Sequence, residues 1–95
     1  MEAERQLRPE DAVELNPNYH FRWEEPQQAH VLLYPEGIVK LNETAAAILE
    51  ACTGSASIAD GSAELARRYN KRNIGAEVLK FLEVAHAKGW IRVKS

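Results

Sequence analysis

Apolar and polar residues alternate over residues 19–24, where Tyr19, Phe21 and Trp23 form one aromatic face, the pattern of a strand. Residues 25–28 break this strand, and after a second one the proline and glycine of residues 35–37 favour a tight turn. Three strands are therefore predicted, over residues 19–24, 29–34 and 38–41. Short connections between successive strands favour an antiparallel sheet.

After residue 41 the apolar residues recur with a helical period. Asn42 and Ser57 are good N-caps, and Gly54 and Gly89 are helix-ending residues. Helices are predicted over residues 43–52, 58–69 and 75–88. The residues expected to face the core are Ala45, Ile48, Leu49 and Cys52, then Ile58, Leu65, Ala66 and Tyr69, and finally Val78, Phe81, Leu82 and Ala85. Gly61 lies inside the second helix and weakens it by roughly 1 kcal/mol relative to Ala.

Three strands followed by three helices predict an α+β fold. The helices should pack on one face of a three-stranded antiparallel sheet, an arrangement related to winged helix-turn-helix proteins. Residues 1–18 are polar and contain two prolines, so we expect an extended arm held by a few contacts or by a neighbouring molecule. Residues 19–95 should form the domain itself.

Length, charge and cysteine content exclude several classes of function. The chain has 95 residues with a formal net charge of -2, which is one small domain without the basic surplus of most nucleic-acid-binding proteins. The polar residues 1–10 do not resemble a signal peptide, and no segment is long and apolar enough for a membrane span. The single cysteine excludes an internal disulfide and favours a reducing cytoplasm. No nucleic-acid or membrane partner is expected.

Residues with catalytic or metal-binding potential are scattered. None of the three histidines has another histidine or a cysteine at metal-ligand spacing, and phosphate-binding glycine motifs are absent. Cys52 lies on an apolar helix face and should be inert. The basic cluster of residues 67–72 could contact DNA, although its position at a helix C-terminus favours a dipole-stabilising role. We therefore expect no cofactor, no metal and no enzymatic activity.

The third strand carries the most informative pattern. Ile38 and Lys40 point to one face and Val39 and Leu41 to the other, so apolar side chains occur on both faces of a strand at the end of a sheet. Exposed edge strands are usually covered or blocked. Either the helices and the N-terminal arm cover this edge, or an incoming extended peptide pairs with it beside the third helix. The pattern alone favours neither interpretation.

Several segments together resemble the pyrroloquinoline quinone biosynthesis protein D family. They are residues 30–37 (HVLLYPEG), 40–42 (KLN), 45–49 (AAAIL), 52–54 (CTG), 81–86 (FLEVAH) and 89–91 (GWI). The resemblance covers roughly residues 19–91, and Gly61 and Ser62 depart from the apolar residues usual in that family.

The resemblance implies a recognition element that binds the precursor of a ribosomally made, modified peptide. It further implies presentation of that peptide to a radical S-adenosylmethionine enzyme, which cross-links a Glu to a Tyr. Carried over by position, the binding site comprises Ile38, Val39, Lys40 and Leu41 on the third strand and Val78, Leu82 and His86 on the third helix. Phe81 is expected in the core.

The leading hypothesis is thus a non-catalytic, cytoplasmic peptide chaperone that binds by strand addition. One alternative is a DNA-binding winged-helix protein. Another is a structural domain whose exposed strand edge is buried by self-association, for example in an intertwined homodimer formed through residues 1–18. Monomer and homodimer both remain open from the sequence.

Overall fold

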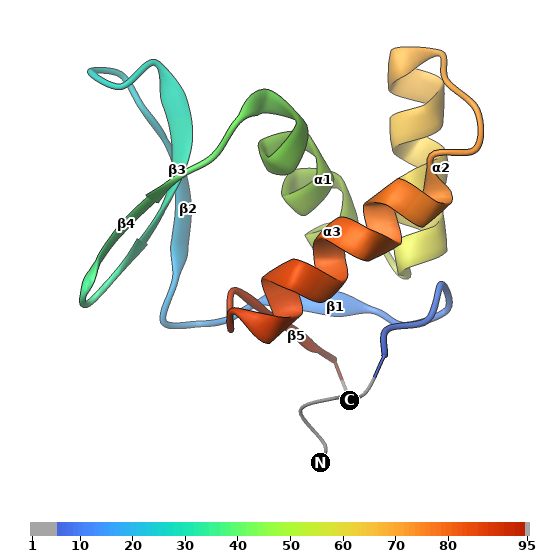
Figure 1. Ribbon diagram of the computed structural model, residues 1–95, viewed down its shortest axis with the longest axis horizontal. Helices are drawn as coiled ribbons and strands as arrows, with labels where there is room; N and C mark the ends of the chain where they lie inside the picture. The colour runs from blue at the N-terminus through green and yellow to red at the C-terminus, as the bar shows by residue number, and fades with distance from the viewer. Residues whose placement is uncertain (1–5, 95) are drawn as a thin grey trace.

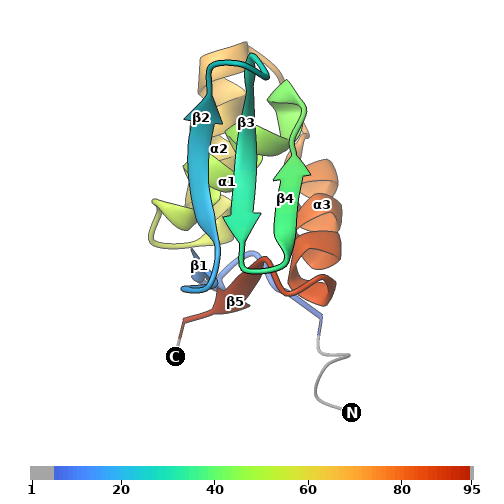
Figure 2. The same cartoon turned by 90° about the vertical axis from the view of Figure 1, so that its left-hand side faces the viewer.

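In the computed structural model, which describes residues 6–94, three helices lie on one face of a small antiparallel sheet (Figures 1 and 2). The elements are β1 (Val13–Leu15), β2 (His20–Glu24), β3 (Ala29–Tyr34), β4 (Gly37–Lys40), α1 (Glu43–Thr53), α2 (Ile58–Tyr69), α3 (Gly75–Ala87) and β5 (Ile91–Val93). Strands β2, β3 and β4 form one sheet in that order, and β1 pairs with β5 in a second. The predicted α+β class, with a three-stranded antiparallel sheet followed by three helices, is confirmed.

One face of the three-stranded sheet packs against the helices (Figure 2). Register places Phe21 of β2 and Val39 of β4 on either side of Leu32 in the central strand. Leu32 is fully buried, and its two neighbours pack half-buried against the same core. The ring of Phe21 also stacks on His30, with 5.0 Å between the ring centroids. The opposite face of the sheet carries no helix (Figure 2).

Helix α1 is the central element of the core. Asn42 caps it as predicted, because its Oδ1 accepts a 2.7 Å hydrogen bond from the amide of Ala45. Seven of its eleven residues are buried, far more than the single stripe of an ordinary surface helix. Their small size, with four alanines among them, lets β3 on one side and α2 and α3 on the other approach closely.

Helix α2 meets α1 at a glycine. A Cβ placed on Gly61 would lie 2.7 Å from the Sγ of Cys52 and 2.8 Å from its Cα, closer than real contacts allow. The departure from apolar residues at this position is therefore required by the α1–α2 packing. The prediction for Tyr69 was wrong: it lies at the end of α2 with 52% of its surface exposed, because the last turn projects beyond α1.

The described part of the N-terminal arm packs on its own domain. Leu7 and Val13 are buried in the common core, and β1 pairs antiparallel with β5. The first two amides of α2, which would otherwise lack partners, donate 2.8 Å hydrogen bonds to this arm. The amide of Ile58 donates to the carbonyl of Asp11, and the amide of Ala59 donates to the carbonyl of Pro9. Ser57 accepts from the third, as its N-cap role predicts. The arm consequently lies on β5 and α2, away from β4 (Figure 1).

Candidate functional site

Strand β4 leaves one side of its backbone without a partner strand. It is the last strand of its sheet and pairs only with β3 among the described residues. Helix α3 lies on the side of this free edge, behind the plane of the sheet (Figure 2). Exposed edges of this kind template pairing with another chain. This edge is short, which limits that hazard.

Hydrogen-bond alternation identifies which backbone groups are free. The amide of Leu41 donates a 2.9 Å hydrogen bond to the carbonyl of His30, the residue opposite it in the β3 ladder. In an antiparallel pair, bonded and non-bonded residues alternate, so Val39 also directs its amide and carbonyl to β3. Ile38 and Lys40 direct theirs outward. The backbone groups of these two residues constitute what we call the β4 edge.

The side chains of the same segment divide between the two faces of the sheet. Leu41 is buried and Val39 half-buried, both on the helix side, so they contribute to the core. Ile38 and Lys40 lie on the uncovered face, and 47% of the Ile38 surface is exposed. Of the four predicted strand residues, two thus offer free backbone groups while the other two hold the strand to the domain.

Three of the four core residues predicted for α3, Val78, Leu82 and Ala85, are buried, and the peptide-binding role of Val78, Leu82 and His86 stays a prediction. Val78 and Leu82 are 2% and 0% exposed and belong to the core, and Val78 also lines a pocket beside α3. Phe81, expected in the core, is half-buried at the helix surface. His86 lies about 140° around the helix from Phe81, because each residue turns the helix by about 100°. It therefore occupies the opposite flank.

The exposed apolar flank of α3 is instead formed by Phe81 and Val84, which we call the Phe81 flank. Val84 is 46% exposed and lies about 60° around the helix from Phe81. The Phe81 ring also contacts the Trp90 ring, with 6.5 Å between centroids. Two apolar residues beside the main buried stripe are a signal visible in the sequence. Periodicity alone does not say which stripe meets the core.

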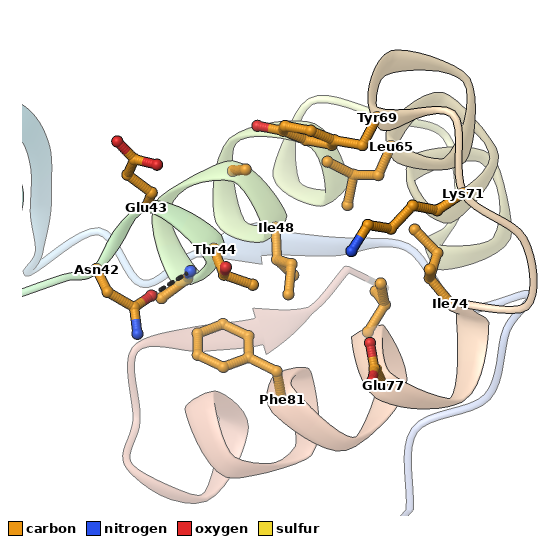
Figure 3. A pocket seen from close by; sticks show the side chains of 13 residues that line it. Asn42, Glu43, Thr44, Ile48, Leu65, Tyr69, Lys71, Ile74, Glu77 and Phe81 are labelled. Atoms are coloured by element: carbon orange, nitrogen blue, oxygen red, sulfur yellow. Dashed lines mark hydrogen bonds between the residues drawn. The ribbon is translucent and has the colours of Figure 1, made fainter.

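A pocket of about 470 Å³ adjoins the Phe81 flank (Figure 3). It lies between the start of α1, the end of α2 and the first half of α3. Its lining begins at Asn42, two residues after β4 ends, and includes Phe81. The β4 edge, the Phe81 flank and this pocket therefore follow one another on one side of the molecule.

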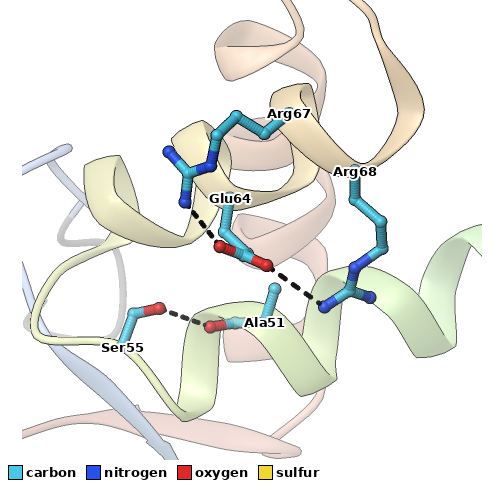
Figure 4. Close-up of polar contacts among 5 residues, drawn as sticks. All are labelled: Ala51, Ser55, Glu64, Arg67 and Arg68. Carbon is cyan, nitrogen blue, oxygen red and sulfur yellow. Dashed lines mark hydrogen bonds and ion pairs between the residues drawn. The ribbon is translucent and has the colours of Figure 1, made fainter.

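The two arginines of the basic cluster that lie on α2 contact Glu64 of the same helix (Figure 4). Glu64 accepts a 2.5 Å hydrogen bond from Arg67 and forms a 3.7 Å ion pair with Arg68. Both arginines also lie in the last turn of the helix, where cations stabilise the dipole. The contacts support the dipole-stabilising interpretation of this cluster.

Other reactive groups offer little chemistry. Cys52 is buried, and burial raises the pKa of its thiol to about 11, so the nucleophilic thiolate is scarce at neutral pH. Within residues 6–94, His, Cys, Asp and Glu side chains do not gather in groups of three or more suited to a metal ion. Over the same range, every helix is too short or too polar to cross a bilayer.

Comparison with known proteins gives a consistent result. Residues 29–91 match the protein family described as “Coenzyme PQQ synthesis protein D (PqqD)”. A “PqqA binding protein” of Methylococcus capsulatus is 46% identical over 86 residues, covering 90% of this chain and 92% of that protein. One from Azotobacter vinelandii is 48% identical over 84 residues, covering 87% and 91% respectively.

A solved structure shares the fold. The solution structure of the PqqD truncation of Methylobacterium extorquens PqqCD superposes with a TM-score of 0.77 and 26% sequence identity. The match covers 97% of this chain and 99% of that one. That protein is described as a functional, stand-alone recognition element for ribosomally synthesized and post-translationally modified peptides.

Proposed function

The chain belongs to the coenzyme PQQ synthesis protein D (PqqD) family, and from that premise we propose that it binds the PqqA precursor peptide by strand addition at the β4 edge. The observation that carries the proposal is the outward direction of the Ile38 and Lys40 backbone groups. A guest strand pairing there would gain main-chain hydrogen bonds that tolerate many sequences. Its alternate side chains would face the Phe81 flank, where apolar contact selects among peptides.

The contribution of the domain is positioning, without chemistry of its own. A bound peptide held beside a partner enzyme reacts at a high effective concentration, because its translational freedom has already been lost. We propose a radical S-adenosylmethionine enzyme as that partner and the cytoplasm as the place of the encounter. The uncovered outer face of the sheet leaves room for a second protein while the β4 edge is occupied (Figure 2).

Self-association through β4 is a second candidate, favoured by the exposed Ile38 beside the free backbone groups. Two copies could pair their β4 strands across a two-fold axis and bury both edges at once. The peptide and the second copy would compete for the same groups. Such a dimer would therefore dissociate as the peptide binds.

Titration calorimetry with synthetic PqqA, combined with light scattering, tests the proposal. We expect one PqqA per chain and a final mass of one chain plus one peptide. A duplex DNA titrated under the same conditions serves as the control for the winged-helix alternative and should give no salt-dependent binding. Absence of PqqA binding at saturating peptide would remove the proposed function.

A further inference from the structure

The pocket between the three helices, which we call the helix pocket, has an apolar interior that the strand-addition mechanism does not use. Leu65 and Val78, both almost fully buried, are part of its lining. The side chains of Ile48, Ile74 and Phe81 converge on it from three elements (Figure 3). An open cavity lined in this way leaves apolar surface in water, which disfavours the empty state.

The polar residues that line the helix pocket are all exposed, whereas its apolar lining residues are buried or half-buried. The polar ones are Asn42, Glu43, Thr44, Tyr69, Lys71 and Glu77. Asn42 already uses its Oδ1 to cap α1, and Glu43 points away from the cavity (Figure 3). Lys71 extends its aliphatic stem along the wall, with its amine toward the interior. Binding sites for small polar metabolites or cofactors fix their ligand with several placed polar groups. The helix pocket instead matches a bulky apolar side chain.

The helix pocket follows directly on the β4 edge, which indicates that the peptide paired with β4 supplies the apolar side chain. Lys40, the last residue of β4, is followed by Leu41 and then by Asn42, which lines the pocket. Phe81 belongs both to the flank beside the β4 edge and to the pocket lining. A peptide paired with β4 that continues past Lys40 reaches the pocket within a few residues, because an extended chain advances about 3.3 Å per residue.

We propose that the helix pocket anchors one large apolar side chain of PqqA, located in the segment that flanks the strand paired with β4. This inference rests on the proposed function and adds a specificity-determining site to it. The strand supplies affinity for any extended backbone, whereas the pocket fixes the register of the peptide along β4. Without such an anchor, a short strand pairing can slip along the edge.

Filling the mouth of the pocket tests the proposal. Thr44 is an exposed residue of α1 that lines the pocket, so Thr44→Trp should occupy it without disturbing the core. We expect the Kd for PqqA to rise by about 10- to 100-fold, the equivalent of losing one buried apolar side chain. Glu50→Trp, which adds the same ring at an exposed position of α1 outside the helix pocket, is the matched control and should bind as the wild type does. Circular dichroism checks that both variants are folded.

The peptide side provides an independent measurement. Replacing the apolar residues of PqqA by Ala one at a time should identify one position, outside the strand-paired segment, whose loss matches the effect of Thr44→Trp. Combining the two changes should add little further loss, as expected for partners in one contact.

The outcomes separate this inference from the proposed function. If Thr44→Trp binds PqqA as tightly as the wild type while Ile38→Pro, which blocks the β4 edge, weakens binding, the anchor is refuted and strand addition stands. Full additivity between Thr44→Trp and every Ala replacement in the peptide would also refute the anchor. If the wild type binds no PqqA, both are refuted.

Discussion

Replacing Ile38 by Pro should raise the Kd for PqqA by at least about tenfold and leave the domain folded. The Ile38 amide points away from β3, so its loss removes no bond within the sheet. Proline is tolerated on edge strands where the N–H side faces solvent. The guest strand would lose one hydrogen bond, worth about 1 kcal/mol, and would meet the bulk of the proline ring where its backbone should lie. Titration calorimetry measures the loss.

Two further variants isolate the cause. Ile38→Ala removes the exposed side chain but keeps the amide, so most of the affinity should remain. Val39→Pro removes an amide that points to β3, so it should destabilise the hairpin itself and lower the thermal midpoint. If Ile38→Pro binds PqqA with wild-type affinity, the β4 edge is not where the peptide pairs.

Replacing Gly61 by Ala should destabilise the fold by about 2 kcal/mol. The added methyl group would lie 2.7 Å from Cys52 Sγ and 2.8 Å from Cys52 Cα, so α2 must move away from α1. Overpacking of this kind costs about 1–3 kcal/mol or more, and the gain of about 1 kcal/mol in helix propensity offsets it only in part. Thermal denaturation should show a midpoint lower by about 10 °C for a domain of this size.

Gly75→Ala is the matched control, because a Cβ at this first residue of α3 meets nothing within 4 Å. Its stability should be unchanged or raised by up to about 1 kcal/mol. A Gly61→Ala protein as stable as the wild type would mean that α1 and α2 are packed less closely than their contact at Cys52 requires.

Local signals in the sequence were sufficient for the main sheet and the helix ends. Residues 19–24 alternate, and the turn residues at 25–28 and 35–37 separate the apolar segments that follow, so β2, β3 and β4 are predicted directly. Asn42 and Ser57 cap α1 and α2 through their own side chains. Each of these features depends on residues within a few positions of one another, which is why periodicity and capping rules predict them.

The second sheet depends on contacts between the two ends of the chain. Val13 of β1 lies opposite Val93 of β5, and no local pattern connects segments so far apart. The buried Leu7 belongs to the same group, since a lone apolar residue in a polar arm does not reveal its partner. The extended arm over residues 1–18 stays a prediction, because residues 1–5 lie outside the described residues, and the strand that β1 pairs with could not be predicted.

The candidate site was only half predictable for a similar reason. Strand alternation assigns the side-chain faces of Ile38 and Val39, but not which of their amides point to β3. That choice follows from the register with β3, which the sequence does not contain. On α3, Val78 and Phe81 are both apolar, and only the position of α1 decides that Val78 is buried and Phe81 is not.

Amide hydrogen exchange followed by NMR tests strand addition at β4 most directly. In the free protein the Ile38 and Lys40 amides should exchange rapidly, whereas the Val39 amide, directed to β3, should exchange slowly. Saturating PqqA should slow exchange at Ile38, at Lys40 or at both, and leave Val39 nearly unchanged. If PqqA binds and the Ile38 and Lys40 amides still exchange as rapidly as in the free protein, the peptide does not pair with β4.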